Sequence, residues 1–276
     1  ILLPAYHGIM ATAAGDMAIP KGTWYGNIFV MLRQLLVFTK PITNQIFDGG
    51  VNLYCGMLAV LTMFLYLFVK EHPWKKFRKY VLLVLLVISF NHGTLNYIWH
   101  GMHDQYGIPN RFSFVFIFVL LVMAYDAVQS ITEIDIYFVI SSTLLAGAFA
   151  FACKQQAGAT IGKYTLPASL VLLVIYGVTC CLRTSKKITH ATYISVIGSV
   201  CLVELVANAA YGFSENGYCH YKQYYKTSPA VTEANVRVRE MAEEEQAGFY
   251  RSELMNYTVL DEASWHNMPS VSTFNS

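Results

Sequence analysis

Six long apolar runs dominate the sequence, separated by short connectors. They are Val51–Val69, Tyr80–Trp99, Phe112–Val128, Ile136–Cys153, Tyr164–Leu182 and Ala191–Ala210. Each has about 17–20 residues, the length that a helix rising ~1.5 Å per residue needs to cross ~30 Å of hydrocarbon. Hydrophobic residues make up 55% of the chain and charged residues 13%, values typical of membrane proteins rather than soluble ones. The sequence therefore predicts an all-α polytopic membrane protein with six transmembrane helices.

The connectors between these runs differ in charge, and this difference predicts the topology. The two most basic connectors are Lys70–Lys79 and Arg183–Lys187. Because basic connectors tend to remain on the cytoplasmic side, we expect both of them to be cytoplasmic. The stretch Asn91–Arg111 and the chain from Tyr211 onward would then lie outside the cell. The net charge of +2 gives no indication of nucleic acid, so no nucleic-acid partner is expected.

The same pattern divides the chain into three parts. We expect an extracytoplasmic loop over residues 1–50, a transmembrane helix bundle over residues 51–210, and the beginning of an extracytoplasmic α+β domain over residues 211–276. In the first part, Trp24–Thr39 has apolar residues on one helical face but is too short to cross a membrane, which predicts an interfacial amphipathic helix. In the third part, Pro229–Gln246 is predicted to be helical, and the residues after it alternate as strands do.

The polar stretch between the second and third runs contains candidates for substrate binding. Asn96, His100, His103 and Arg111 lie within or next to hydrophobic sequence, where polar groups are costly and usually have a purpose. Arg111 opens a helix after the break at Pro109, and its guanidinium fork together with free helix N–H groups favours an anion. With His100 it would form a phosphate clamp at the outer membrane face. On spacing alone, an equally good interpretation is that Arg111 anchors a helix end at headgroup depth.

The spacing of His100, His103 and Asp104 also permits a metal site, because it can place two imidazoles on one face of a helix. Two histidines without a third firm ligand are a weak signal, and the same residues fit a loop that contacts water or headgroups. We therefore predict no metal and no cofactor. The sequence contains no glycine-rich phosphate loop, G-x-S-x-G elbow or H-E-x-x-H motif, and no catalytic residue is assigned.

Glu204 and Asn208 lie one helical turn apart inside the sixth run. An acidic side chain in such a position normally faces the interior of the helix bundle. Three roles remain open for the pair: a proton relay, contact with a substrate, and a buried hydrogen bond to another helix, which is the usual role. We therefore include both residues among the candidates for substrate binding.

Several short motifs, taken in their order along the chain, resemble the bacterial YfhO family of polytopic membrane proteins. The core of the resemblance is LNYIWHG, followed by a proline and then by RFSFVFIF. The matching segments are Ile1–Pro4, Asn52–Leu58, Leu95–Gly101 with Pro109, Arg111–Phe118, Val203–Tyr211, Phe249–Glu253 and Ser270–Ser276. They occur in the right order from the first residues to the last, so the likeness extends over most of the chain.

The resemblance implies a GT-C type helix bundle and a glycosyltransferase in a bacterial cell membrane. Enzymes similar to this family take a sugar from a polyprenyl-phosphate carrier and add it to a cell-surface polymer such as teichoic or lipoteichoic acid. Their catalytic base is typically an acidic residue of the first outside loop, which would precede Ile1. Because the chain starts without a methionine or a signal peptide, we expect an internal excerpt of a longer protein. Its residues would help to form the cleft for carrier and acceptor among the membrane lipids.

Two other functions remain as alternatives. A transporter or flippase for a lipid-linked or cell-envelope substrate would use Glu204, Asn208 and the interrupted second run to line a pathway. Such a protein should have polar groups at mid-depth in both halves and an internal repeat, whereas this sequence concentrates its polar groups at one face and shows no repeat. A purely structural membrane scaffold is the third possibility, although it does not explain the buried polar residues.

Overall fold

The computed structural model describes residues 22–42, 50–102, 110–157, 162–216, 228–252 and 266–269. The chain divides into two compact units, Ile1–Asn216 and Gly217–Ser276. Helices account for all the regular structure of the described residues, apart from one isolated β-bridge between Trp24 and His92. The predicted helical class is therefore confirmed. The strands expected over Phe249–Glu262 fall largely on residues 253–262, outside the described residues.

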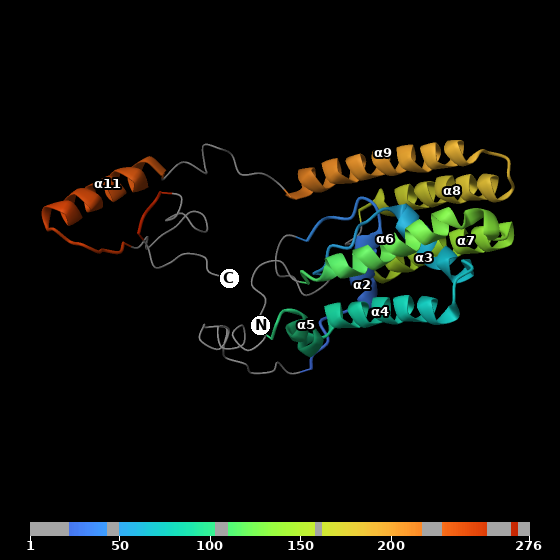
Figure 1. Ribbon diagram of the computed structural model, residues 1–276, viewed down its shortest axis with the longest axis horizontal. Coiled ribbons are helices and arrows are strands. Elements are labelled where there is room, and N and C mark those ends of the chain that lie inside the picture. The colour runs from blue at the N-terminus through green and yellow to red at the C-terminus, as the bar shows by residue number, and fades with distance from the viewer. Residues whose placement is uncertain are drawn as a thin grey trace. The chain divides into compact units, whose positions relative to one another are not determined.

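The first unit is a bundle of eight α-helices and three short 3-10 helices in its described part (Figure 1). The α-helices are α2 (Ile28–Leu32), α3 (Met57–Leu65), α4 (Pro73–Asn91), α5 (Gly93–Trp99), α6 (Ser113–Gln129), α7 (Ile136–Ala157), α8 (Thr165–Thr184) and α9 (His190–Asn216). The 3-10 helices are η2 (Arg33–Leu35), η3 (Tyr66–Phe68) and η4 (Ile131–Glu133).

Three helices of the described chain are long and apolar enough to cross a membrane. They span Ile136–Gln156, Thr165–Thr184 and His190–Glu215, and so confirm the last three predicted runs. Two shorter apolar helices, Met57–Phe68 and Ser113–Gln129, correspond to the first and third runs. The prediction of six helices of full spanning length is not confirmed: the first run becomes helical only at Met57, the second is divided at His92, and the third forms a shorter helix of 17 residues.

The first predicted run begins as extended chain rather than as helix. Residues 50–56 have no helical structure, and α3 starts only at Met57. Gly56, directly before the helix, has φ 104°, a left-handed conformation that favours glycine. Val51 and Leu53 are nevertheless fully buried. Hydropathy reports burial and not conformation, so a buried extended segment has the same apolar signature as a helix.

The second predicted run is divided at His92, whose backbone is extended (φ −121°, ψ 119°) and separates α4 from α5. This extended residue pairs with the segment before α2: His92 forms a β-bridge with Trp24, and the Gly93 amide donates to the Thr23 carbonyl at 2.9 Å. The Asn91 side-chain amide also bonds both the N–H and the C=O of Gly26, at 3.0 and 2.9 Å. These long-range bonds end the helix where the local sequence alone predicts continuation.

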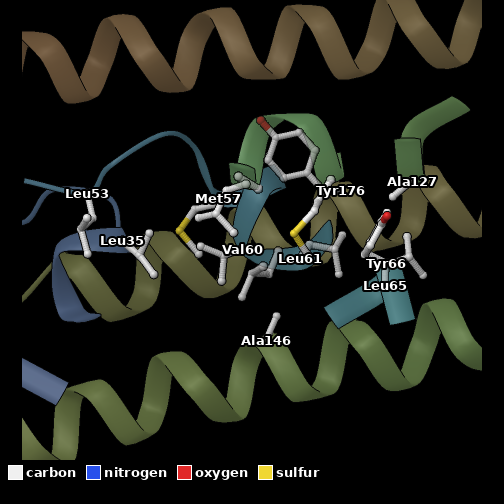
Figure 2. Close-up of a cluster of buried hydrophobic side chains, with 14 of the residues drawn as sticks. Leu35, Leu53, Met57, Val60, Leu61, Leu65, Tyr66, Ala127, Ala146 and Tyr176 are labelled. Atoms are coloured by element: carbon white, nitrogen blue, oxygen red, sulfur yellow. The ribbon is translucent and has the colours of Figure 1, made fainter. Parts of the chain in front are cut away.

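The core of the bundle is built around α3, which packs against α6, α7 and α8. Figure 2 shows side chains of α3 interdigitating with residues of the neighbouring segments. The labelled set comprises Leu35, Leu53, Met57, Val60, Leu61, Leu65, Tyr66, Ala127, Ala146 and Tyr176. By contrast, α9 lies at the edge of the bundle beside α8 (Figure 1). Most of its apolar residues are exposed, as expected for a helix that faces lipid.

The segment Trp24–Thr39, before α3, differs from the amphipathic helix that the sequence predicts. Regular structure is restricted to α2 and η2, which together cover residues 28–35. Arg33 and Gln34, expected on an exposed polar face, are buried with 8% and 3% exposure. The Gln34 side chain donates to the Lys40 carbonyl at 3.3 Å. The helix therefore packs into the bundle, beside α7, on both its apolar and its polar side.

The second unit contains α11 (Ser228–Glu244), close to the predicted helix over Pro229–Gln246. Its polar face holds the short segment 266–269. The Asn235 amide donates to the His266 carbonyl at 2.7 Å, and the Arg239 guanidinium donates to the Asn267 carbonyl at 2.5 Å. A helix that binds a non-local segment in this way belongs to a folded unit.

Candidate functional site

Glu204 on α9 is the most fully enclosed acidic group of the described chain, with 3% exposure. Its Oε1 atom accepts hydrogen bonds from the Tyr54 hydroxyl at 2.6 Å and from the Met57 backbone N–H at 2.5 Å. Its Oε2 atom accepts from the Tyr176 hydroxyl at 2.6 Å. The carboxylate therefore has three donors from two other parts of the bundle: Tyr54 and Met57 at the start of α3, and Tyr176 on α8.

One of these donors explains why α3 begins where it does. The Met57 N–H is among the first four amides of α3, which have no acceptor within the helix. The residue before it, Gly56, has no side chain to cap the helix. The Glu204 carboxylate supplies the missing acceptor from a different helix and places a negative charge at the positive end of the α3 dipole. A distant glutamate thus performs the role that a local serine or aspartate usually performs.

The position of Glu204 along α9 places this helix start deep in the bundle. Glu204 is near the middle of α9, about 20 Å from either end at ~1.5 Å per residue. The chain consequently reaches mid-depth in extended form over residues 50–56 and only then becomes helical. A helix that starts at mid-depth, with an ionisable group at its N-terminus, is a recurrent feature of membrane proteins that handle polar substrates.

Asn208 holds a second segment, at Phe38, one turn further along α9. Its side-chain oxygen accepts from the Phe38 N–H at 2.7 Å, and the Thr165 hydroxyl donates to the Phe38 carbonyl, also at 2.7 Å. Phe38 has φ 55°, a strained conformation for a residue with a side chain, and its ring packs edge-on against Tyr211. The polar groups of Glu204 and Asn208 therefore both bind backbone of the segments that precede α3.

A second polar cluster surrounds Asn96 of α5, which is 2% exposed. The Asn96 amide donates to the side-chain oxygen of Asn110 and to the Ser89 carbonyl, the latter at 3.4 Å. The Asn110 amide in turn donates to the Gly50 carbonyl at 2.8 Å. Asn110 adopts φ 56°, which asparagine tolerates better than most residues. The cluster joins α4, α5, the start of α6 and the extended segment before α3.

The two clusters are the two anchors of one segment. Residues 50–57 are held at Gly50 by Asn110 and at Tyr54 and Met57 by Glu204. The candidate residues therefore do not converge on a single pocket. Instead, Asn96 and Glu204 fix opposite ends of the same buried strand-like segment.

His100 follows directly on the Asn96 cluster. Its Nδ1 atom lies 2.9 Å from the Asn96 carbonyl, and because a carbonyl can only accept, Nδ1 carries the proton. The ring packs edge-on against Phe112, with centroids 5.6 Å apart. Arg111 precedes Phe112 and is exposed. At the start of α6, Phe112 therefore has the His100 ring packed against it and Arg111 next to it in the sequence, whereas His103, the other member of the predicted set, lies outside the described residues.

The chain matches the family model of the bacterial membrane protein YfhO over residues 1–276. It belongs to the YfhO family. No curated protein and no solved structure matches it. Membership of this family, together with the three membrane-capable helices, confirms that the chain is part of a membrane protein.

A metal centre receives no support from the described part of this YfhO-family chain. No group of three or more His, Cys, Asp or Glu side chains is gathered there in a way that could hold an ion. His100 uses Nδ1 for the Asn96 carbonyl, and the possible partners His103 and Asp104 are outside the described residues. Metal binding by this trio is therefore untested.

Several residues that build these clusters were missed by sequence reasoning. Tyr54 and Tyr176 lie in apolar runs, where a phenol requires a hydrogen-bond partner, and this requirement was a usable signal. Asn110 was also missed, although an asparagine directly after a proline and before a helix start indicates a special backbone conformation. The pairing of both tyrosines with Glu204 could not be read from spacing, because the three residues are far apart in the chain.

Proposed function

We propose that this YfhO-family chain forms part of a GT-C type glycosyltransferase. The enzyme would transfer a sugar from a polyprenyl-phosphate carrier to a cell-surface polymer such as teichoic or lipoteichoic acid. The observation that carries the proposal is the start of α6, where the exposed Arg111 directly precedes Phe112, the His100 ring packs edge-on against Phe112, and the Asn96–Asn110 hydrogen bond holds the adjoining backbone. Arginine binds phosphate oxygens through two parallel hydrogen bonds, and it suits the phosphate of the carrier.

The surroundings of this arrangement fit a lipid-linked donor. On α5 and just after it, Ile98, Trp99 and Met102 are exposed by 50%, 40% and 48%. The Trp99 ring stacks on Phe112, and its Nε1–H donates to the Ser89 hydroxyl at 3.1 Å. An amphipathic ring with its polar atom bonded and its apolar edge exposed is typical of a membrane–water boundary. The polyprenyl chain would lie along this apolar edge while its phosphate faces Arg111.

In the proposed reaction, a hydroxyl oxygen of the acceptor polymer forms a bond with the anomeric carbon of the sugar. The bond between that carbon and the carrier phosphate oxygen breaks, and the phosphate leaves on the polyprenyl chain with the bonding electron pair. Arg111 stabilises the negative charge that develops on the leaving phosphate, and His100 contributes as an imidazolium through Nε2–H, because its Nδ1–H is bonded to the Asn96 carbonyl. The proton of the acceptor hydroxyl passes to a carboxylate base outside the residues to which we assign a role.

The experiment supplies membranes containing the full-length protein with a radiolabelled undecaprenyl-phosphate sugar and follows the label into surface polymer. We expect Arg111→Ala and His100→Ala to lower transfer at least about a hundredfold, the usual effect of removing one charge-stabilising donor. Lys163→Ala is the matched control, because Lys163 is an exposed cation before α8 that packs over Tyr164. Transfer at the wild-type rate in both test variants, with normal insertion, would rule out this assignment.

A transporter or flippase remains the second candidate, and one observation favours it. The α3 helix starts at mid-depth beside Glu204, as the discontinuous helices of transporters do. If deletion of the gene leaves label transfer unchanged, the same vesicles should be tested for movement of the intact lipid-linked sugar between leaflets. Glu204→Gln would then be the first variant to measure.

A further inference from the structure

The start of α4 carries an exposed patch of aromatic and basic side chains. We call it the aromatic–basic patch, and it consists of Lys70, Trp74, Lys75, Phe77 and Arg78. Trp74 and Phe77 are 58% and 54% exposed, and their rings stack with centroids 5.2 Å apart and an interplanar angle of 19°. The rings contact each other instead of the core, so this pair contributes little to the packing of the bundle.

The aromatic pair continues the apolar outer face of α4. Val81 and Val84 are also exposed, by 45% and 58%, and the positions 74, 77, 81 and 84 recur at helical spacing on one face. From Trp74 to the end of α4 at Asn91 the helix is about 27 Å long, with its basic residues confined to the first two turns and apolar residues beyond them. Trp74 and Phe77 therefore lie where the apolar face ends, at the boundary with the headgroups.

Two other basic residues of this helix are bound within the protein and are not part of the patch. The Lys79 ammonium donates to Asp126 at 2.8 Å and to the Tyr66 hydroxyl at 2.6 Å, and the Lys76 ammonium donates to the Leu67 carbonyl at 2.9 Å. These contacts fix the start of α4 against η3 and α6. Lys76 and Lys79 are therefore occupied by contacts inside the bundle.

The cations of the patch, in contrast, face outward. Lys70 and Arg78 are exposed and make no ion pair with any residue that the structure describes. Lys75 is 59% exposed in its side chain and lies 3.8 Å from Glu71, which it shares with Lys79. The first turn of α4 contains no acidic residue, so the basic side chains and the positive end of the helix dipole add together. This surface is complementary to an anion.

We propose that the aromatic–basic patch binds the headgroup of an anionic phospholipid of the surrounding membrane. Arg78, Lys75 and Lys70 contact the phosphodiester, Trp74 and Phe77 lie at the level of the glycerol, and an acyl chain follows Val81 and Val84. The continuous apolar face favours a lipid over a free phosphate, because a soluble anion would leave that face without a role. By the positive-inside rule, this lipid belongs to the cytoplasmic leaflet. The proposal does not depend on the glycosyltransferase activity.

The test is native mass spectrometry of the detergent-purified protein titrated with phosphatidylglycerol or, separately, with phosphatidylcholine. The test variant is Lys75→Gln/Arg78→Gln. The control is Lys186→Gln/Lys187→Gln, which removes the same charge from two exposed residues of the loop between α8 and α9. Each basic residue near an anionic surface contributes roughly a factor of five, so we expect the test variant to bind phosphatidylglycerol about thirtyfold more weakly. Binding of phosphatidylcholine to the test variant should change less than about twofold, and so should binding of either lipid to the control variant.

Three results would overturn the proposal. One is an equal loss of phosphatidylglycerol affinity in the test and control variants, which would indicate general attraction to basic loops. Another is an equal loss of both lipids in the test variant. The third is full displacement of phosphatidylglycerol by soluble glycerol phosphate, which would identify a free-phosphate site. If the test variant unfolds, the wild type decides the matter: added salt must weaken phosphatidylglycerol binding and leave phosphatidylcholine binding unchanged, because screening acts on charge alone.

Discussion

Glu204→Ala is the sharpest test of how the bundle is held together. The carboxylate accepts from the Tyr54 hydroxyl, the Met57 N–H and the Tyr176 hydroxyl, and alanine removes all of these acceptors at once. A buried donor that loses its acceptor costs about 1–3 kcal/mol. Tyr176 retains an alternative acceptor, the Cys201 sulfur at 3.2 Å, so two donors bear the full cost. We expect the free energy of unfolding to fall by about 2–6 kcal/mol.

Glu204→Gln separates the charge from the hydrogen bonds. The glutamine oxygen can still accept from Tyr54 and Met57, and its NH₂ group can donate to the Tyr176 hydroxyl, which then donates to Cys201. What is lost is the attraction between the carboxylate and the positive end of α3, worth roughly 0.3–2 kcal/mol. Glutamine should therefore cost about 1 kcal/mol, a small part of the alanine effect.

Two measurements check both variants. Thermal unfolding in detergent gives the order of stability, which should be wild type, glutamine, alanine. Hydrogen exchange over residues 50–60 should increase strongly in the alanine variant, because the first turn of α3 loses its cap. Glu215→Ala is the control, since Glu215 is near the end of the same helix and forms only a 3.8 Å ion pair with the exposed Lys40. If Glu204→Ala unfolds with the wild type and exchanges no faster over residues 50–60, Glu204 does not fix this segment and our interpretation is wrong.

Two further predictions concern helix packing and pH. A Cβ atom on Gly177 would lie 2.6 Å from the Thr143 Oγ1 atom across the α7–α8 contact, so Gly177→Ala should lower the free energy of unfolding by about 1–3 kcal/mol. Gly198 has open space around it, so Gly198→Ala should be neutral or stabilise α9 by up to about 1 kcal/mol. Equal effects of the two variants in thermal unfolding would contradict this prediction. The hydrogen bond from the Tyr66 hydroxyl, aided by the charge of Lys79 and opposed by burial, lowers the pKa of Glu71 below its ordinary 4.5. A carboxyl group whose pKa is lowered by folding stabilises the protein at pH values above its pKa in the unfolded chain, and this stability is lost as the pH falls through its pKa in the folded protein. Glu71→Gln should therefore weaken the acid dependence of the melting temperature below about pH 4.5. An unchanged acid dependence would show that Glu71 is not its source.

The sequence predicted the elements whose local pattern agrees with their environment. The runs that became α7, α8 and α9 are continuous and apolar, and each folds as one helix of spanning length. A buried hydrogen bond between helices was one of the roles left open for Glu204, and the bonds from Met57 and Tyr176 are of this kind. For these elements, the hydropathy and length of the run are sufficient to predict the helix that forms.

The breaks in the first two runs could not be predicted, because long-range hydrogen bonds produce them. The chain at His92 is extended because it pairs with Trp24, which lies 68 positions earlier in the sequence (92 − 24). The start of α3 at Met57 depends on a carboxylate from α9. A hydropathy pattern records that these residues are buried, and it contains no information about which distant donor or acceptor will interrupt a helix.

The connection between the two polar clusters decides how functional data on Glu204 should be interpreted. Asn110, next to the proposed phosphate-binding Arg111, holds Gly50, while Glu204 holds Tyr54 and Met57 of the same segment. A change at Glu204 can therefore shift the start of α6 without any contact between Glu204 and substrate. Loss of transfer in Glu204→Ala that is restored in Glu204→Gln would identify a positioning role, because glutamine keeps the hydrogen bonds that hold the segment. Loss in both variants, with the segment still protected from exchange, would require the charge itself and would favour the transport interpretation.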